Sequence, residues 1–233
     1  MKQWPEADLT IVVPARHEAA TIAAALKPLQ GLRARGAEVI VVDGDSSDHT
    51  AELAEPWVDQ IVHSAAGRAT QMNAGARASR RRVLLFLHAD TLLPLDAGSV
   101  VLNGLESSGR IWGRFDVCIE PQQRMLQVVA AMMNLRSRVS GICTGDQSLF
   151  MTRDAFDAVG GFPDQPLMED IEICRRLKCL SPPLALRSRV CTSGRRWLTR
   201  GIWRTITLMW WLRLRYFLGA EPEGLARLYQ APR

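Results

Sequence analysis

The feature that most constrains the fold is a run of five apolar residues, at positions 83–87, that ends directly in His88 and Asp90. Such a run, without polar alternation, is typical of a strand that is buried on both faces of a parallel sheet. The carboxyl ends of strands in open α/β sheets face the ligand crevice. Because His88 and Asp90 are two residues apart, both side chains can point to one side and hold a divalent metal. From this stretch alone, an ordinary polar turn is an equally good interpretation.

The chain before this strand alternates between strand and helix patterns. Strands are predicted at 9–14, 38–42 and 60–63, and helices at 21–30, at 50–55 with Asp48 as its cap, and from Gly67 onwards. Further on, a strand is predicted at 113–119, a helix at 125–139 and a glycine turn into a strand at 145–151. This alternation predicts an α/β fold with a mostly parallel sheet and helices on both of its faces.

Charged residues follow three of these predicted strands. Arg16 and Glu18 follow the first, Asp43 ends the second, and Asp90 follows the run at 83–87. The carboxyl ends of parallel strands meet at one sheet edge, so these side chains should line one crevice. The crevice has no glycine-rich dinucleotide loop and no P-loop. A metal that is held by carboxylates and bridges a diphosphate is the simplest phosphate-binding device for it.

The net charge of +5 conceals a strong asymmetry. Residues 175–233 hold 13 Lys and Arg against two acids, whereas residues 1–174 hold 16 against 22. A basic C-terminal part favours an anionic partner, which could be a phosphate-bearing ligand, a lipid surface or a nucleic acid. The basic residues lie in a Trp- and Leu-rich segment without a nucleic-acid-binding motif, so we expect no nucleic-acid partner.

The segment 197–218 contains four of the seven tryptophans. Aromatic residues and leucines beside arginines are typical of a helix that lies in the lipid headgroup region, which predicts a peripheral membrane contact. The competing interpretation is a helix whose tryptophans cover the sheet or a second subunit, and homo-oligomerisation is left open. No run of about 18 uncharged apolar residues exists that could span a bilayer as a helix.

Five cysteines, an odd number without a CxxC pair, favour a reduced cytosolic interior over a disulfide framework or a zinc site. The first eight residues are acidic and interrupted by Pro5, which does not fit a signal peptide. We therefore expect a cytoplasmic protein, with the inner face of the membrane as an alternative place.

The chain resembles the inverting family-2 glycosyltransferases of GT-A type, and more narrowly a bacterial subgroup associated with arsenosugar biosynthesis. The residues that carry the resemblance stand in the family's order: VPARHE at 13–18, VVDGDSSD at 41–48, GRATQMN at 67–73, LHAD at 87–90, GGF at 160–162 and Glu169-Asp170. The matches cover about residues 9–200. The resemblance implies a GT-A (Rossmann-like) domain at 1–200, with 201–233 as an amphipathic helical extension of the same domain.

The resemblance also implies roles for individual residues. Asp170 is the expected general base, and Asp90 with His88 the expected metal ligands. An imidazole shifts the metal preference from Mg²⁺ toward Mn²⁺. Donor binding is expected from Pro14, Arg16, Glu18, Asp43, Asp45, Arg68, Asn73, Asp90 and Arg196. Acceptor binding is expected from Asp146, Gln147 and Glu169.

The expected function is a metal-dependent, inverting transfer of one sugar from a nucleotide-diphosphate sugar, with UDP favoured, to an unidentified acceptor hydroxyl. A lipid-linked acceptor is one alternative. The QxxRW motif of processive members is reduced to Arg196-Trp197, which argues against a polymerising enzyme. Two functions are alternatives to this transfer reaction. One is a sugar nucleotidyltransferase, which needs a glycine that 14–18 lacks; the other is a catalytically impaired transferase fold that binds membrane surfaces.

Overall fold

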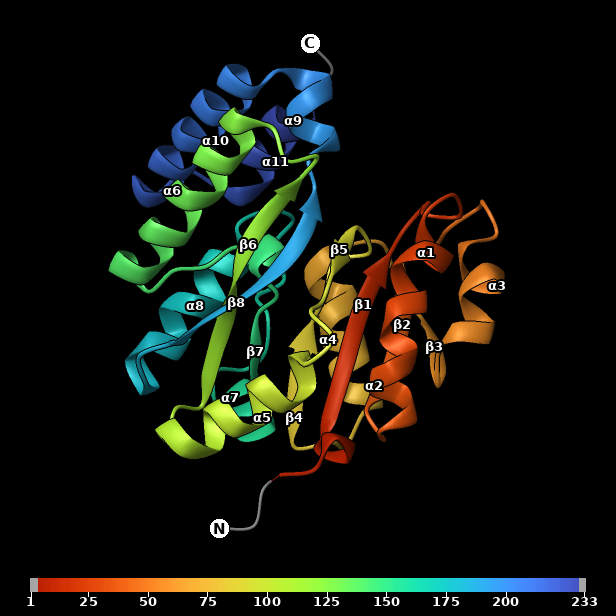
Figure 1. Cartoon of the computed structure of the whole chain (residues 1–233). Coiled ribbons are helices and arrows are strands. Elements are labelled where there is room, and N and C mark those ends of the chain that lie inside the picture. The colour runs from red at the N-terminus through yellow and green to blue at the C-terminus, as the bar shows by residue number, and fades with distance from the viewer. Residues whose placement is uncertain (1–3, 231–233) are drawn as a thin grey trace.

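The computed structural model describes residues 4–230, which form one curled, eight-stranded sheet flanked by helices (Figure 1). The strand order is β3 (Gln60–His63), β2 (Glu38–Asp43), β1 (Leu9–Ala15), β4 (Val83–Phe86), β7 (Phe150–Thr152), β6 (Trp112–Glu120), β8 (Leu184–Ser193) and β5 (Thr91–Leu92). The first four strands are mutually parallel, as predicted. β7 runs antiparallel to both of its neighbours, β6 and β8 are parallel, and β5 is antiparallel to β8. The predicted α/β class with helices on both faces is confirmed.

The helices are α1 (Ile22–Leu26), α2 (Gln30–Ala34), α3 (Thr50–Ala54), α4 (Arg68–Ala78), α5 (Ala97–Ser108), α6 (Arg124–Ser140), α7 (Arg153–Ala158), α8 (Glu169–Leu180), α9 (Arg195–Arg200), α10 (Ile202–Phe217) and α11 (Pro222–Gln230). Short 3₁₀ turns lie at Glu6–Asp8, Lys27–Leu29, Glu55–Trp57 and Gly145–Gln147. The turn at Lys27–Leu29 divides the helix predicted at 21–30, because Pro28 lacks the N–H that a continuing α-helix requires.

Apolar residues pack on both faces of the sheet because successive strand residues point to opposite sides. In β1, Ile11 and Val13 belong to the core beneath α1, α2, α5 and α6. Val12 belongs to the second core, beneath α4, α7 and α8. The run at 83–87 is fully buried, which confirms a central strand.

The C-terminal helices pack against the start of α8 rather than on the sheet alone. Leu167, Met168 and Ile171 form a small core with Leu212 of α10 and Leu225 of α11. In Figure 1, α9–α11 and α6 lie together at the upper left, beyond the ends of β6 and β8. The C-terminal segment therefore contributes one side of the region next to Asp170.

Two local predictions need correction. Asp48 does not cap α3, which has His49 at its N-cap and no side-chain cap. The Asp48 carboxylate instead accepts hydrogen bonds from the Ala19 N–H at 3.1 Å and the Thr50 hydroxyl at 2.5 Å, tying the loop after β1 to α3. The segment 145–151 forms a 3₁₀ turn before a shorter strand, β7.

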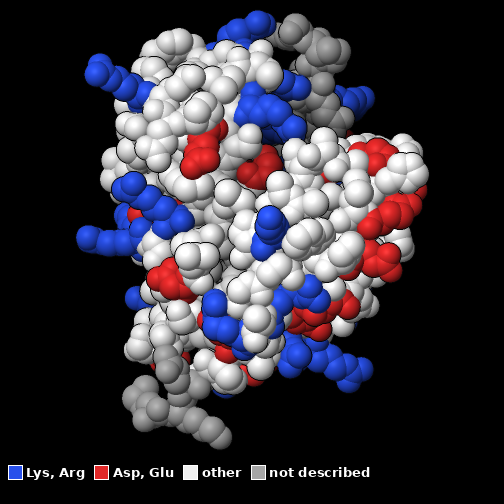
Figure 2. All heavy atoms as spheres, turned by 45° about the vertical axis from the view of Figure 1, so that its right-hand side comes forward, with Lys and Arg blue, Asp and Glu red and all other residues white. Residues whose placement is uncertain are grey.

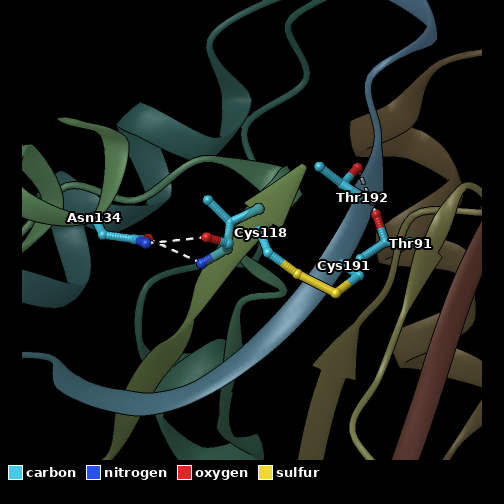
Figure 3. Close-up of a disulfide and its surroundings, with 6 residues drawn as sticks. Thr91, Cys118, Asn134, Cys191 and Thr192 are labelled. Carbon is cyan, nitrogen blue, oxygen red and sulfur yellow. Dashed lines mark hydrogen bonds between the residues drawn. A yellow bond between two sulfur atoms is a disulfide. The ribbon is translucent and has the colours of Figure 1, made fainter. Parts of the chain in front are cut away.

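The expectation of only reduced cysteines is wrong, because Cys118 and Cys191 form a disulfide between β6 and β8 (Figure 3). The two cysteines are register partners in the parallel strand pair, with Cα atoms 4.7 Å apart. They are 73 residues apart in sequence, so spacing carried no signal of the bond. Nearby, Asn134 of α6 bonds both the N–H and the carbonyl of Val117, and the Thr91 and Thr192 hydroxyls lie 3.0 Å apart.

Candidate active site

Asp43, the last residue of β2, brings a buried carboxylate to the crevice edge of the sheet. Its side chain is almost fully covered, and Oδ2 accepts a hydrogen bond from the Ser46 N–H at 3.1 Å. Oδ1 is buried and has no hydrogen-bond partner among residues 4–230. A buried carboxylate oxygen without a donor is costly, so this atom is available to a ligand N–H or O–H.

The residues after β1 form the rim beside Asp43. Pro14 pairs with Val42 inside the sheet, while Arg16 and Asp45 are exposed. Glu18 is partly covered and accepts a hydrogen bond from the Thr21 hydroxyl at 2.6 Å. His17 and Asp45 have positive φ angles of 54° and 63°, a conformation that non-glycine residues seldom adopt and that clusters at functional sites.

His88, after β4, contacts a distant loop. Its Nδ1 lies 3.4 Å from Oδ1 of Asp146, and its ring packs against the backbone of Gly145. A Cβ at position 145 would lie 2.3 Å from two ring atoms, so only glycine fits beside the imidazole. Asp90 is exposed, with the Thr91 hydroxyl 3.4 Å from its Oδ1.

The N-terminus of α8 presents two carboxylates. Glu169 is buried and its Oε1 lies 3.4 Å from Nε of Arg68. Asp170 accepts one hydrogen bond from the Gly145 N–H at 3.0 Å and one from the Ile171 N–H at 2.8 Å. The Asp170 carboxylate thus ties the 3₁₀ turn at Gly145–Gln147 to the start of α8, 25 residues later in the sequence.

In the pair of Arg68 and Glu169, the carboxylate is buried whereas the Arg68 side chain is 37% exposed. Burial raises the pKa of Glu169, and the charge of Arg68 only partly offsets this effect. For Arg68, burial acts to lower the pKa, but Glu169 and the other acidic residues around it hold the value above the ordinary one. The guanidinium therefore stays charged, and it can also attract an anionic ligand.

A cavity of about 480 Å³ brings together most of these groups between α8, α6 and α10. Six predicted site residues line it: Arg68, His88, Asp146, Glu169, Asp170 and Arg196. Pro14, Arg16, Glu18, Asp43, Asp45 and Asp90 are not among its lining residues and belong to the neighbouring sheet edge. Figure 2 shows basic side chains in the upper part of the molecule, directly above two groups of acidic side chains.

Two predicted ligand-binding residues have their amides engaged with the protein itself. Asn73 donates to the Phe162 carbonyl at 2.8 Å and accepts from its N–H at 2.9 Å, anchoring the GGF loop. Gln147 is fully buried and donates to Asn134 and Ser137 of α6 at 3.2 and 3.0 Å. These amides hold loops of the site in place, and the expected ligand contacts of Asn73 and Gln147 stay predictions.

The apolar part of the cavity and two of its cations were not expected from the sequence. Met132 and Met133 of α6, with Met209 and Trp210 of α10, form its walls, and Arg136 and Arg213 lie among them. The sequence signal for these two cations was the presence of Arg136 and Arg213 within helices that are otherwise rich in apolar residues. It was not decisive, because core packing explains such helices equally well.

The carboxylates of the site fit a metal that is shared with a substrate. The described part of the chain contains no group of three or more His, Cys, Asp or Glu side chains that could hold a metal ion. Mg²⁺ and similar ions need only one or two carboxylates when substrate phosphates and water complete the shell. Asp90 is the exposed carboxylate at the right strand end, whereas the contact of His88 is with Asp146.

The model of Glycosyl transferase family 2 matches residues 10–158, and the chain therefore belongs to this family. The order of the strands in the sheet agrees with this assignment. A comparison with curated protein sequences finds no match.

Similar solved structures include three that contain GDP-Man, UDP-GlcNAc or UDP. Mannosyltransferase PcManGT from Pyrobaculum calidifontis, in complex with GDP-Man and Mn²⁺, is 18% identical with a TM-score of 0.67; the match covers 99% of this chain and 73% of that one. S. aureus TarS 1–349 with UDP-GlcNAc is 15% identical with a TM-score of 0.67, over 79% and 58%. Glucosyl-3-phosphoglycerate synthase from Mycobacterium tuberculosis, with Mn²⁺, UDP and phosphoglyceric acid, is 16% identical with a TM-score of 0.59, over 79% and 69%. At these identities the likeness establishes the fold.

Proposed function

We propose that this chain is a metal-dependent, inverting glycosyltransferase that moves one sugar from a nucleotide-diphosphate sugar to an acceptor hydroxyl. The main support is that Asp170, a candidate base, lines one cavity with Arg68 and Arg196, two candidate ligands for a diphosphate. A base and a leaving-group site on either side of one cavity suit a single displacement, which inverts the anomeric carbon.

The donor lies along the sheet edge in this proposal. The unpartnered Oδ1 of Asp43 accepts a hydrogen bond from the nucleoside, and Arg16 and Asp45 flank it at the rim. Asp90 holds Mn²⁺ or Mg²⁺, which neutralises charge on the diphosphate leaving group when bound. Arg68 and Arg196 stabilise the same charge from the cavity side. UDP remains the favoured nucleotide.

The acceptor approaches from the side of α8. Asp170 takes the proton of the attacking hydroxyl, and its two backbone hydrogen bonds fix the carboxylate in place. Asp146 and Glu169 complete the wall around the acceptor hydroxyls. His88 acts on Asp146 through their 3.4 Å contact and is the less favoured metal ligand. Membership of the arsenosugar-associated subgroup stays a prediction and names no acceptor.

A panel of nucleotide sugars, assayed for hydrolysis and transfer with and without Mn²⁺, tests the proposal. We expect metal-dependent turnover of at least one donor. Asp90→Ala should abolish metal-dependent nucleotide binding without changing the melting temperature. Asp96→Ala is the matched control, since Asp96 is exposed and makes no cap hydrogen bond at α5. Unchanged UDP affinity in Asp90→Ala would remove the metal assignment. No turnover of any donor would favour the membrane-surface binding module instead.

We also propose a peripheral membrane contact through α6 and α10, at the inner face of the membrane. Val128, Met132, Leu135 and Val139 of α6 are each at least 52% exposed, and α10 exposes Trp203, Trp210, Leu214 and Phe217 to at least 58%. The two helices lie side by side in Figure 1 and line the same cavity. Within residues 4–230 no helix is long and apolar enough to cross a membrane. A second subunit that covers this face is the competing outcome.

A further inference from the structure

Arg136 of α6 and Arg213 of α10 line the same cavity. Nε and Nη2 of Arg136 and Nε of Arg213 are buried and have no hydrogen-bond partner among the residues that the structure describes. Arg136 donates one bond, from Nη1 to the Ile142 carbonyl at 3.3 Å. Neither guanidinium forms a salt bridge within the described chain, and Asp170, which lines the same cavity, is the acidic residue whose charge acts on both.

Keeping the charged Arg136 and Arg213 close together in a largely buried place costs free energy when no ligand is bound. Burial and the nearby charge of Arg213 lower the pKa of Arg136 to about 10, and burial also lowers the pKa of Arg213. Buried charged groups are normally paired, and unpaired N–H donors normally find an acceptor. An anion between the two guanidiniums would supply both the missing charge and the missing acceptors.

The surroundings of the two arginines are apolar. Val129, Met132 and Met133 line the cavity from α6, and Ile206, Met209 and Trp210 line it from α10. Flexible methionines and an aromatic ring suit a hydrocarbon chain of variable shape. The apolar lining continues onto exposed Met132 and Trp210, so a chain that enters here can extend toward the surface.

We infer that this cavity is the subsite for an acceptor lipid whose phosphate lies between Arg136 and Arg213 and whose hydrocarbon chain lies between α6 and α10. The inference rests on the proposed function and adds the chemical class of the acceptor. A soluble phosphorylated acceptor would meet the same arginines but would leave the apolar walls uncovered. The acceptor hydroxyl lies beyond the phosphate, beside Asp170, which lines the same cavity.

The transfer step follows from this order of groups. The acceptor O–H bond breaks and its proton moves to the Asp170 carboxylate. The acceptor oxygen forms a bond to the anomeric carbon as the bond from that carbon to the donor phosphate oxygen breaks. The nucleoside diphosphate leaves with the electron pair, and the two arginines keep the acceptor phosphate in place throughout.

Calorimetry with three soluble probes tests the subsite on the full chain. The probes are dodecyl phosphate below its micelle concentration, methyl phosphate and dodecyl maltoside. We expect dodecyl phosphate to bind at least about tenfold more tightly than either of the others, because it alone has both the anion and the chain. If methyl phosphate binds as tightly as dodecyl phosphate, the hydrocarbon chain does not contribute and the lipid assignment is wrong. If dodecyl maltoside binds as tightly, the phosphate does not contribute and the anion site is wrong.

Two variants on different helices are compared, so that a folding defect in one variant cannot explain the results of both. Arg136→Gln and Arg213→Gln should each weaken dodecyl phosphate binding by about tenfold or more. Arg215→Gln is the matched control, since Arg215 is on the same helix as Arg213 but is not a lining residue. An equal loss in Arg215→Gln would show that only the overall charge matters and would overturn the inference.

Nucleotide-sugar turnover by the unaltered chain, measured beside dodecyl phosphate binding, separates the lipid subsite from the proposed transfer reaction. Nucleotide-sugar turnover without dodecyl phosphate binding would remove the lipid subsite and leave the transferase. Dodecyl phosphate binding without turnover of any nucleotide sugar would retain a lipid-phosphate site and remove the proposed transfer reaction.

Discussion

Asp170, the proposed base, also helps to hold the site together. Its carboxylate accepts backbone N–H groups from two separate segments, so its oxygens are fixed before any substrate arrives. A base that is already oriented needs no reorganisation when the acceptor hydroxyl binds, which is the advantage of preorganised sites. Glu169, directly before it, is instead buried against Arg68.

Asp170→Asn should lower the transfer rate by about two to four orders of magnitude, the usual scale for loss of a general base. Donor affinity should stay the same, because the base acts on the acceptor. Single-turnover kinetics and donor titration measure the two quantities. Glu172→Gln is the control, since Glu172 is on the same helix but bonds Arg175 and Arg176 at 2.8 and 2.9 Å. A near-normal rate in Asp170→Asn would place the base elsewhere, with Glu169 the next candidate.

At the residue scale, the sequence predicts those features of a side chain that depend on residues close to it in the chain. The places of Asp43 and Asp90 at strand ends could be predicted because each lies close to an apolar strand pattern. The hydrogen bonds that Asn73 and Gln147 make within the protein could not be predicted, because an amide looks the same whether it faces a ligand or a backbone 89 residues away, as Asn73 does. The contact of His88 with Asp146 was missed for the same reason: it joins two loops 58 positions apart.

At the element scale, α4 is pressed directly onto β1 and β2. A Cβ on Gly75 would lie 2.4 Å from Val12 Cγ1 and 2.9 Å from Val42 Cγ2, well inside van der Waals contact. The helix that carries Arg68 therefore lies as close to the sheet as a glycine allows. Its distance from the sheet in turn fixes where Arg68 meets Glu169.

Gly75→Ala should therefore destabilise the protein by up to about 2 kcal/mol, because overpacking of about 1–3 kcal/mol exceeds the gain of about 1 kcal/mol in helix propensity. Gly224→Ala, in α11, has no atom within 4 Å of the added Cβ and should be neutral or slightly stabilising. Urea unfolding of both variants makes the comparison. Equal stability of the two would mean that α4 can move away from the sheet at little cost.

The elements that the sequence predicted well are those with a strong local pattern, such as β1, β4 and α6. α5 and β8 had no such expectation. β8 is half-exposed along most of its length and carries Arg187 and Arg189, so its apolar pattern is weak. Its place in the sheet depends on pairing with β6, about 70 residues earlier, which no local window contains.

At the scale of the whole molecule, the apolar side chains on α6 and α10 form one exposed face beside the cavity. With anionic vesicles at low salt, the protein should float, and added salt should reduce the floating fraction, because each basic residue near the surface contributes about 1 kcal/mol. Trp210→Ala combined with Trp211→Ala should reduce flotation sharply, since both tryptophans are exposed.

Leu53→Ala combined with Leu95→Ala is the control for flotation. These leucines are 44% and 84% exposed but lie on other elements of the molecule, so their loss should leave flotation unchanged. If the unaltered chain does not float with anionic lipid at low salt, the peripheral membrane contact is wrong. A concentration-dependent dimer would then explain the exposed face.

The position of the Cys118–Cys191 disulfide can make ligand binding depend on the redox state of the protein's surroundings. β6 leads into α6 and β8 leads into α9 and α10, so the disulfide joins the two strands just before each continues into a wall of the cavity. The bond closes a long loop, worth about 4 kcal/mol in the chain-entropy account, and the sheet edge at residues 9–90 lies outside that loop. Mild reduction should therefore loosen the two walls and weaken dodecyl phosphate binding, while nucleotide binding stays intact. Binding of the lipid substrate would then respond to the redox state of this one bond.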